Sequence, residues 1–470
     1  MTDIKDTNIP SVHAEALSIP AKSLYGLTPK VEDAIMQAVA AGEAGRVRAL
    51  TAPLHSADMA DLLGRISPKK CGALLRLLGD ALDSEAIAYL DQQVRDQVLE
   101  IMGPESIAKA LPDLDSDDAV TVVEELEPQE RDEVLKNLPV QDRVIVEQGL
   151  SYPEDSAGRM MQREMVMLPP YWTVGQTVDH LRSLKQPTHQ DFYLIMVVDA
   201  HFHPVGEINV GRLLRANRPV RLSEIMETDF RSVPVNMDQE EVAMLFRRYG
   251  MVTTSVVDDD GRLVGVITLD DIVDVIDEEA EEDLMALAGV SDASIRSSFI
   301  ETFQGRAGWL FVNLVTAVLA SLVIGLFEST LETIVALAVL MPIVASMGGN
   351  AGTQTVTVAV RAIAMQEFST QSAARFAFRE LLVGITNGVL FALVAGLVSY
   401  IWFSDVSLSL ILGGAMIINL VIAGLTGTIV PLSLVRLGID PAVASSVFIT
   451  TITDVVGFFV FLGLAAAFLL

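Results

Sequence analysis

The chain has 470 residues, more than one domain of ordinary size, and 51% of them are hydrophobic, with a mean hydropathy of +0.44. This composition indicates a membrane protein. The formal net charge is −29, and the first 305 residues hold 54 acidic and 27 basic side chains. Such an acidic segment repels nucleic acid and anionic lipid and attracts cations, so a nucleic-acid partner is excluded. The single cysteine, Cys71, excludes an internal disulfide framework and is typical of a cytoplasmic compartment.

The N-terminal part is predicted to be helical. Residues 1–28 indicate a flexible tail without the charged-then-apolar pattern of a signal peptide, so the first 305 residues are expected to stay in the cytoplasm. From residue 29 to 150, apolar residues recur every three or four positions, and Ser67-Pro68 and Glu127-Pro128 mark helix starts. Similar short units repeat, which predicts an α-helical, superhelical N-terminal domain. This region holds no catalytic constellation.

Residues 151–269 contain two similar halves. The sequence at 197–214 matches 256–273 at an offset of 59, and 161–174 matches 226–239 at an offset of 65. The first half therefore has six extra residues, which we place around 185–190. Strand, turn and helix patterns repeat in each half. This duplication resembles a tandem pair of CBS domains, α/β modules that often bind adenine nucleotides.

Thr268 and Asp271 fit the ribose-contacting T-x-x-D of such modules. The first half has Asn209 and Arg212 at these places, which weakens the case for ATP as a ligand. His201 and His203 flank a turn, and a surface turn is favoured over metal ligation there.

The stretch DDIVDVIDEEAEED, residues 270–283, lies between the polar N-terminal part of the chain and the apolar segments that follow it. Nine of its fourteen residues are acidic and none is basic. Apolar residues interleave at helical spacing, so we predict one connecting helix within residues 270–305. Like charges three or four residues apart destabilise a helix, and hard divalent cations with oxygen ligands would offset this repulsion. The alternative is a solvated acidic linker.

Five apolar segments follow within residues 306–470, and each is long enough to cross a bilayer. They predict an all-α membrane domain with spans at about 307–327, 333–360, 381–404, 406–435 and 441–468. Arg361, Arg375 and Arg379 fall between the second and third spans, and Arg436 falls between the fourth and fifth. The positive-inside rule then places the N-terminal domains in the cytoplasm and the C-terminus outside.

Asp454 is the sole charge inside a predicted span. A carboxylate at the middle of a bilayer costs roughly 2.5–3.5 kcal/mol on insertion scales, so it is expected to face water, a partner or an ion. Thr450 shares its helix face by the i,i+4 rule. The alternative is a carboxylate paired within the bundle, but the spans offer no basic residue near this depth.

The second span contains MPIVASMGGNAGTQT, residues 341–355. Pro342 and the glycines around Gly349 weaken a helix, so we expect broken backbone there, with Asn350 and freed carbonyl groups beside a cation path. The alternative is close helix packing through small residues.

Three sequence blocks and the order of the domains resemble the MgtE family of bacterial magnesium channels and transporters. The blocks are YPEDSAG (152–158), MPIVASMGGNAGTQT (341–355) and GIDPAVASSVFITTITDVVG (438–457). The resemblance implies a homodimer in the inner membrane with a central pore, in which one Asp454 per subunit selects hydrated Mg²⁺. It also implies that the acidic run is a plug helix, which closes the pore when cytosolic Mg²⁺ is high.

The resemblance further implies a set of regulatory carboxylates, and two departures from the family pattern. Mg²⁺ ligands are expected at Asp238, Glu240, Asp271, Asp274, Glu279, Glu282, Asp283 and Asp440. Gly250 stands where relatives commonly have an aspartate. Thr121 also replaces a frequent aspartate, which leaves Asp117 as the expected ligand in the N-terminal domain.

Two other functions stay open at this point. One is a broader divalent importer that accepts cobalt, manganese or nickel. The other is a membrane-tethered sensor of Mg²⁺ or nucleotide without transport, against which Asp454 and the second span argue. An enzyme is not expected, because the spans hold no histidine or cysteine and no Walker motif is present.

Overall fold

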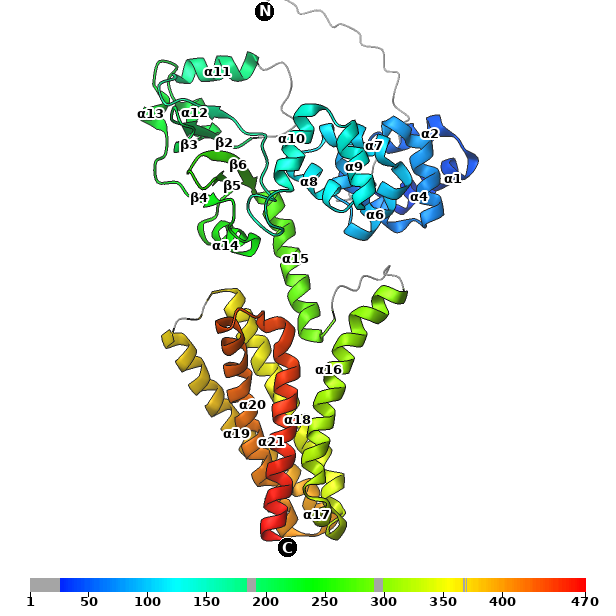
Figure 1. Cartoon of the computed structure of the whole chain (residues 1–470), viewed down its shortest axis with the longest axis vertical. Coiled ribbons are helices and arrows are strands. Elements are labelled where there is room, and N and C mark those ends of the chain that lie inside the picture. The colour runs from blue at the N-terminus through cyan, green and yellow to red at the C-terminus, as the bar shows by residue number, and fades with distance from the viewer. Residues whose placement is uncertain (1–25, 184–191, 291–298, 367, 369) are drawn as a thin grey trace, which may run out of the picture. The chain divides into compact units, whose positions relative to one another are not determined.

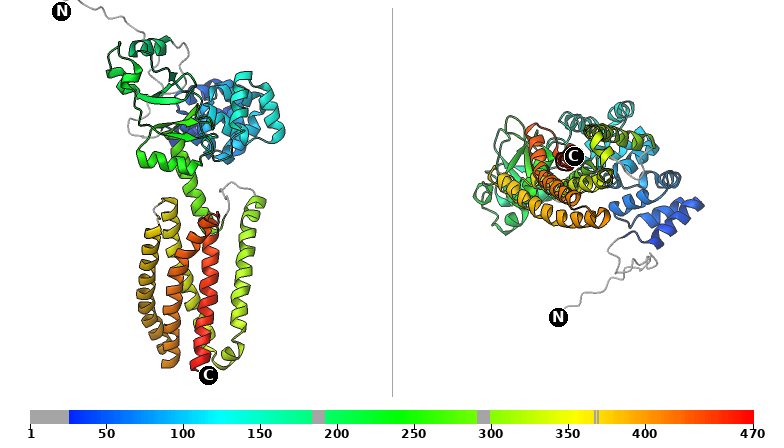
Figure 2. Two further views of the ribbon diagram at one scale, coloured as in Figure 1. Left: turned by 60° about the vertical axis from the view of Figure 1, so that its left-hand side comes forward. Right: turned by 90° about the horizontal axis from the view of Figure 1, so that it is seen from below.

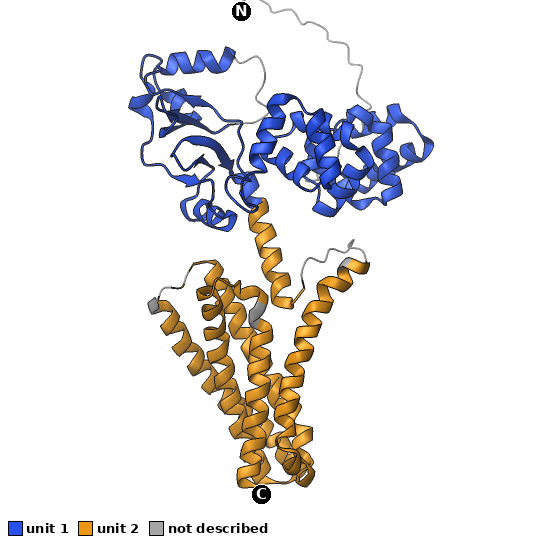
Figure 3. Cartoon of the chain, in the orientation of Figure 1, with its two compact units in different colours: residues 1–273 blue, residues 274–470 orange. Residues whose placement is uncertain are grey.

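The computed structural model describes residues 26–183, 192–290, 299–366, 368 and 370–470 (Figure 1). Most of the predicted tail and the insertion placed around 185–190 lie outside these residues. The chain divides into two compact units, residues 1–273 and 274–470 (Figure 3). We describe each unit separately.

The N-terminal part of the first unit is a chain of short α-helices, as predicted. Proline occupies the first helical position in α1, α4, α7 and α9, where its missing N–H is not needed. The helices bury two successive apolar cores, one around Leu62 and Leu74 and one around Ile107 and Val123. Their bounds are α1 Pro29–Ala41, α2 Ala44–Thr51, α3 Ser56–Arg65, α4 Pro68–Leu78, α5 Glu85–Ala88, α6 Gln92–Met102, α7 Pro104–Ala110, α8 Ser116–Glu124, α9 Pro128–Asn137 and α10 Val140–Gly149.

Two three-stranded sheets follow, and their pairing repeats the sequence duplication. In each sheet the first two strands are parallel and the last two are antiparallel. Leu194 pairs with Asn209 in the first sheet and Thr253 pairs with Thr268 in the second, which reproduces the offset of 59. The strands are β1 Met167–Leu168, β2 Leu194–Val198, β3 Pro204–Asn209, β4 Ser232–Pro234, β5 Thr253–Val257 and β6 Leu263–Thr268. Their helices are α11 Val174–Ser183, α12 Val210–Arg215, α13 Leu222–Ile225 and α14 Gln239–Tyr249.

The YPEDSAG segment joins the helical part to the second sheet module. The backbone N–H groups of Ala157 and Gly158 donate to the carbonyl oxygens of Met237 and Val235, at 2.7 and 2.8 Å. Arg159, directly after the segment, forms an ion pair with Glu124 of α8 at 3.2 Å. Backbone bonds therefore join the segment to the residues just before α14, and the Arg159 side chain joins it to the helical domain.

Helix α15 (Leu269–Ala288) contains the whole acidic run, so the predicted connecting helix is present and longer than the run itself. The boundary between the two units falls within it, after Val273. Residues 291–298 of the predicted connecting region lie outside the described residues.

The second unit holds five helices that are long and apolar enough to cross a membrane. They are α16 Phe299–Gly325, α18 Ala336–Ala364, α19 Thr370–Phe403, α20 Val406–Arg436 and α21 Pro441–Phe468, with the short α17 Glu328–Thr333 between the first two. Figure 2 shows from a second direction that α19, α20 and α21 lie alongside one another. The predicted fold class is confirmed. Arg375 and Arg379, which we expected between spans, lie in the first turns of α19, where long basic side chains can reach the membrane interface.

Glycines bring α19 and α20 into backbone contact. Gly384 and Gly388 form a GxxxG pair, and a Cβ at either would lie 2.9–3.0 Å from the backbone of α20 at Leu420 or Ile417. Gly424 meets the carbonyl oxygen of Glu380 in the same way. Small residues at such crossings allow close van der Waals packing without help from the hydrophobic effect.

The expected break in the second span is wrong. Helix α18 is continuous through Pro342 and all three glycines. Two of these glycines serve packing: a side chain at Gly348 would overlap Asn419 of α20, and one at Gly352 would overlap Ile449 of α21. The alternative that the sequence left open, small residues at helix contacts, therefore accounts for these positions.

Candidate cation path and acidic pairs

Helices α18 and α21 run antiparallel, and their contacts fix a register. Val356 and Val360 of α18 pack in one cluster with Ala442 and Ile449 of α21. Further along, Leu340 and Val344 share a cluster with Phe461 and Ala465. Facing residue numbers therefore sum to about 804, so Asn350 and Asp454 lie at the same level of the helix pair.

A polar stripe runs along α18 at this level. Its members are exposed in the single chain and recur at helical spacing: Ser346, Asn350, Thr353, Gln354 and Thr357. Asn350 Nδ2 donates to Ser346 Oγ at 3.4 Å, and Thr353 Oγ1 donates to the carbonyl oxygen of Gly349 at 2.9 Å. Gly349 adjoins the stripe, and a Cβ there would meet nothing within 4 Å.

Helix α21 presents the other predicted path residues. Thr450 is exposed and donates to the carbonyl oxygen of Ser446 at 2.8 Å, while Asp454 is half-buried one turn later. Within the described residues, the Asp454 carboxylate makes no hydrogen bond or ion pair. The alternative of a carboxylate paired inside this chain's bundle is therefore not seen. Uncharged polar groups and one carboxylate at membrane depth are suited to a hydrated cation.

Sequence reasoning missed a second buried carboxylate. Glu380 lies in α19, with its side chain 12% exposed, and its Oε2 accepts a hydrogen bond from Thr355 Oγ1 of α18 at 3.1 Å. The predicted span began one residue after it. Arg375 and Arg379, which precede Glu380, indicated a loop between spans. A charged side chain can nevertheless lie within the last turns of a span when it faces a neighbouring helix.

In the first unit, Asp117 and Asp271 come together. Asp117 is 7% exposed in α8, and its Oδ1 has no hydrogen-bond partner among the described residues. Burial and the neighbouring carboxylates of Asp271 and Asp118 raise the pKa of Asp117 well above its usual range. Burial likewise raises the pKa of Asp271 to about 7, even though Thr268 Oγ1 donates to its Oδ2 at 2.7 Å. We call these two residues the upper acid pair.

In the second unit, Asp283 and Asp440 interact. Asp283 lies on α15 and Asp440 caps α21, accepting from the N–H of Ala442 at 2.7 Å. Burial is the main cause of a raised pKa at Asp283, and the charge of Asp440 adds to it. Ala286 of α15 is buried against Val356, Val360 and Ile449, which holds this end of α15 on α18 and α21. We call Asp283 and Asp440 the lower acid pair.

The remaining predicted ligands are placed as follows. Asp238 caps α14, its Oδ1 accepting from the N–H of Glu240 at 2.9 Å. Asp274, Glu279 and Glu282 lie on α15. Within the described residues, no group of three or more His, Cys, Asp or Glu side chains is already gathered as a metal site.

The two departures from the family pattern have local structural roles. Gly250 ends α14 in the left-handed conformation, with φ of 63°, which a side chain rarely adopts. Thr121 Oγ1 donates to the carbonyl oxygen of Asp117 at 3.1 Å within α8. Neither position supplies a carboxylate: Gly250 ends its helix, and Thr121 bonds within its helix.

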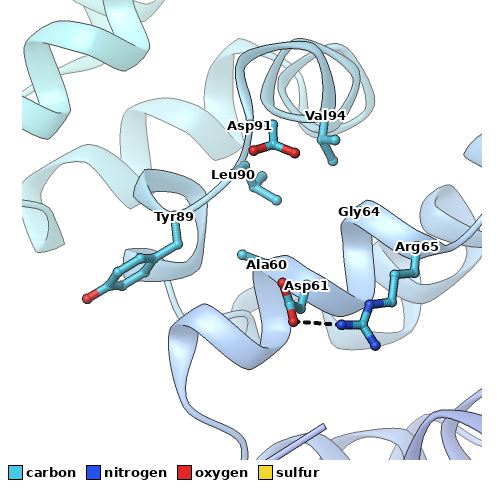
Figure 4. Close-up of a pocket in the computed structure, with 8 residues that line it drawn as sticks. All are labelled: Ala60, Asp61, Gly64, Arg65, Tyr89, Leu90, Asp91 and Val94. Atoms are coloured by element: carbon cyan, nitrogen blue, oxygen red, sulfur yellow. Dashed lines mark hydrogen bonds and ion pairs between the residues drawn. The ribbon is translucent and has the colours of Figure 1, made fainter. Parts of the chain in front are cut away.

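A surface cavity of about 200 Å³ lies in the helical domain (Figure 4). Its polar side chains include Asp61 and Arg65, which pair with each other at 3.0 Å, and Tyr89. The turn with His201 and His203 is also accounted for locally, since His203 contacts Asp199 and the carbonyl oxygen of Asp260, each at 3.2 Å. Neither place gathers groups for catalysis.

Comparison with known proteins shows which family this chain resembles. Family models match a divalent cation transporter domain at residues 341–464, an MgtE intracellular N domain at 54–155 and a CBS domain at 222–278. The magnesium transporter MgtE of Bacillus subtilis is 33% identical over 68% of this chain and 71% of that protein. The MgtE proteins of Enterococcus faecalis and Thermus thermophilus are 32% and 33% identical, each over 71% of their length and over 69% and 68% of this chain.

Two solved structures are also similar to part of this chain. A crystal structure of the cytosolic domain of the Mg²⁺ channel MgtE in complex with ATP is 28% identical, covering 52% of this chain and 99% of that chain, with a TM-score of 0.49. The soluble part of a magnesium transporter is 25% identical, covering 53% and 98%, also with a TM-score of 0.49. On its sequence relatives, its family domains and its five apolar helices, this chain is a multi-pass membrane protein of the MgtE family of divalent cation transporters.

Proposed function

We propose that this protein is a magnesium-selective channel or transporter of the bacterial inner membrane, closed by cytosolic Mg²⁺. The observation that carries the proposal is the common level of Asn350 and Asp454 on two antiparallel membrane helices. A carboxylate with no partner in its own chain is costly at membrane depth, so it is expected to face water and a cation.

The chemistry of these groups favours Mg²⁺ with its water shell. Mg²⁺ gives up its waters reluctantly, so a path that selects it needs oxygen groups spaced for a hydrated ion rather than a tight cage. Amide, hydroxyl and carboxylate oxygens of Asn350, Thr450 and Asp454 are of this kind. The expected carbonyl group of Gly349 is next to Asn350 in the chain and accepts a hydrogen bond from Thr353 Oγ1.

A homodimer completes the path. The polar stripe of α18 and the Thr450 side of α21 are exposed in one chain, although they lie in spans whose other exposed faces are apolar. Facing lipid would leave these groups without hydrogen-bond partners, whereas a second copy encloses them around water. Each subunit then contributes one Asp454.

Closing by Mg²⁺ is proposed to use the two acid pairs. In each pair one carboxylate raises the pKa of the other: Asp271 raises that of Asp117, and Asp440 raises that of Asp283. The two carboxylates of a pair therefore repel each other when both are ionised, until protons or cations neutralise them. A hard divalent cation binds such oxygens and would hold α15 against α8 at one end and against α21 at the other. Loss of these ions would release α15 from α8 and α21, and the cation path would then open.

The orientation follows from charge. Arg361, Arg375, Arg379 and Arg436 all lie near the end of the bundle that carries Asp440, so this end and the N-terminal domains are proposed to face the cytoplasm. The C-terminus, an odd number of spans away, is then proposed to lie outside the cytoplasm.

Growth rescue tests the transport function. A bacterial strain deficient in Mg²⁺ uptake is expected to grow at low Mg²⁺ when it expresses this chain. Absence of rescue despite insertion of the protein in the membrane would contradict transport and favour a sensor. Rescue together with equal uptake of cobalt, manganese or nickel would contradict selectivity only.

We predict that Mg²⁺ protects the whole chain from limited trypsin digestion. At ten times its dissociation constant, an ion that binds only the compact form stabilises it by about 1.4 kcal/mol, which slows cleavage about elevenfold. A variant with Asp117→Asn and Asp271→Asn should lose much of this protection. A control with Asp277→Asn and Glu281→Gln, both exposed on α15, should keep it. Equal cleavage of wild type in chelator and in Mg²⁺ would refute the idea.

An adenine nucleotide at the second CBS module is proposed to contact Thr268 and Asp271. Because Asp271 also belongs to the upper acid pair, nucleotide and regulatory cation would share one carboxylate. ATP binding to the full chain, measured by calorimetry, should weaken in Thr268→Val. Unchanged affinity in that variant would place the nucleotide elsewhere.

A further inference from the structure

One buried amide touches both helices of the proposed cation path. Asn419 lies on α20 with no exposed surface, and its Nδ2 donates to the carbonyl oxygen of Val344 on α18 at 2.9 Å. It is the side chain next to Gly348 of α18 and Gly457 of α21. Three helices therefore meet at this amide.

The Asn419 amide fits between α18 and α21 because Gly348 and Gly457 have no side chains. A Cβ at Gly457 would lie 2.8 Å from Asn419 Nδ2, and one at Gly348 would overlap the same atom. Asn350 follows Gly348 by two residues, and Asp454 precedes Gly457 by three. A shift of either helix along its axis would therefore move a path residue and also collide with Asn419.

The need to fill space between the helices does not explain why this residue is an asparagine. Its Oδ1 is buried and has no hydrogen-bond partner among the described residues, which is unfavourable in an apolar surrounding. An apolar residue would avoid that cost. An apolar residue could not donate to the Val344 carbonyl group, and this bond joins α20 to α18 at this level.

We propose that Asn419 is a positioning residue, which keeps Asn350 and Asp454 at one level and thereby sets selectivity for the hydrated cation. The inference rests on the proposed function of Asp454 in the cation path. Asn419 does not itself touch the ion in this account. Its role is to fix the separation of two groups that do.

The test compares Asn419→Ala with wild type in membrane patches of the full chain, with the Mg²⁺ to Ca²⁺ permeability ratio and the unit conductance as readouts. Misplacing a positioned group by about 1 Å can cost about 100-fold in rate, so we expect the ratio to fall at least about tenfold. The concentration of internal Mg²⁺ that closes the channel should stay the same. The control is Asn313→Ala, because the bond that Asn313 makes among the described residues is to the carbonyl oxygen of Trp309 in its own helix.

A second variant separates the hydrogen bond from the space that the side chain fills. Asn419→Asp has the same shape, and its protonated carboxyl group can donate to Val344 whereas its ionised form cannot. The permeability ratio, taken relative to wild type at each pH, should approach the wild-type value at low pH and fall as pH rises.

Two results would overturn the positioning role while leaving the proposed function intact, provided that the wild type conducts. One is a Mg²⁺ to Ca²⁺ permeability ratio in Asn419→Ala equal to that of the wild type. The other is a permeability ratio in Asn419→Asp that does not change with pH. If Asn419→Ala does not fold, the pH comparison alone decides. Wild type that fails to conduct would instead contradict the proposed function itself.

Discussion

Asp454→Asn is expected to abolish Mg²⁺ uptake while the protein still folds and inserts. A dication 5 Å from a carboxylate gains roughly 2–7 kcal/mol for effective dielectric constants between 80 and 20. Asparagine keeps the shape and removes this attraction. Since 1.4 kcal/mol corresponds to a factor of ten, uptake should fall at least about tenfold. Removing a half-buried charge from a span should not destabilise the bundle.

The measurement is Mg²⁺-dependent growth of the uptake-deficient strain, together with the amount of protein in the membrane. Asp405→Asn is the matched control, because Asp405 is an exposed carboxylate at the end of a span, where it caps α20. Rescue at the wild-type level by Asp454→Asn would show that this carboxylate is not in the path.

Neutralising the five expected ligands of α15 should leave selectivity unchanged and disable closing. Removing the charges relieves repulsion by about 0.2–0.5 kcal/mol for each like-charge pair, so the helix should persist. It also removes the oxygens through which Mg²⁺ would favour the closed state. Coupling between sites is typically about 5- to 150-fold, so half-closure should need at least about fivefold more internal Mg²⁺. The variant carries Asn or Gln at Asp271, Asp274, Glu279, Glu282 and Asp283.

The control neutralises the other four acids of the same helix, Asp270, Asp277, Glu278 and Glu281. It removes a similar charge, so a general effect of net charge would appear in both variants. Open probability in patches, recorded against internal Mg²⁺, distinguishes them. If the five-site variant closes at the wild-type concentration, the acidic run is a solvated linker and the gate lies elsewhere.

Local patterns were sufficient to predict the elements. The span lengths predicted five membrane helices, and the repeat at an offset of 59 predicted two similar modules, whose strand pairings show the same offset. Both depend on short-range periodicity, which a single sequence shows directly.

Contacts between distant residues were beyond such reasoning. Asp117 and Asp271 are far apart in the sequence, and they interact in a fold where α8 contacts the segment that follows the helical domain, through the Arg159–Glu124 and Ser116–Glu164 contacts. The sequence does not point to Asn419, because a lone asparagine in an apolar run does not reveal that it faces two glycines. The expected break in α18 failed for a related reason: a glycine that weakens an isolated helix can strengthen a helix contact, and the neighbours decide which effect prevails.

The most direct test of the account is Mg²⁺ flux into liposomes that contain only this protein, with the Mg²⁺ concentration on the side of the N-terminal domains varied. We predict flux well above that of empty liposomes when this concentration is low, and a steep fall as it rises. Flux that is absent at every concentration would contradict the cation path through Asp454, and flux that is independent of Mg²⁺ on that side would contradict closing through the acid pairs.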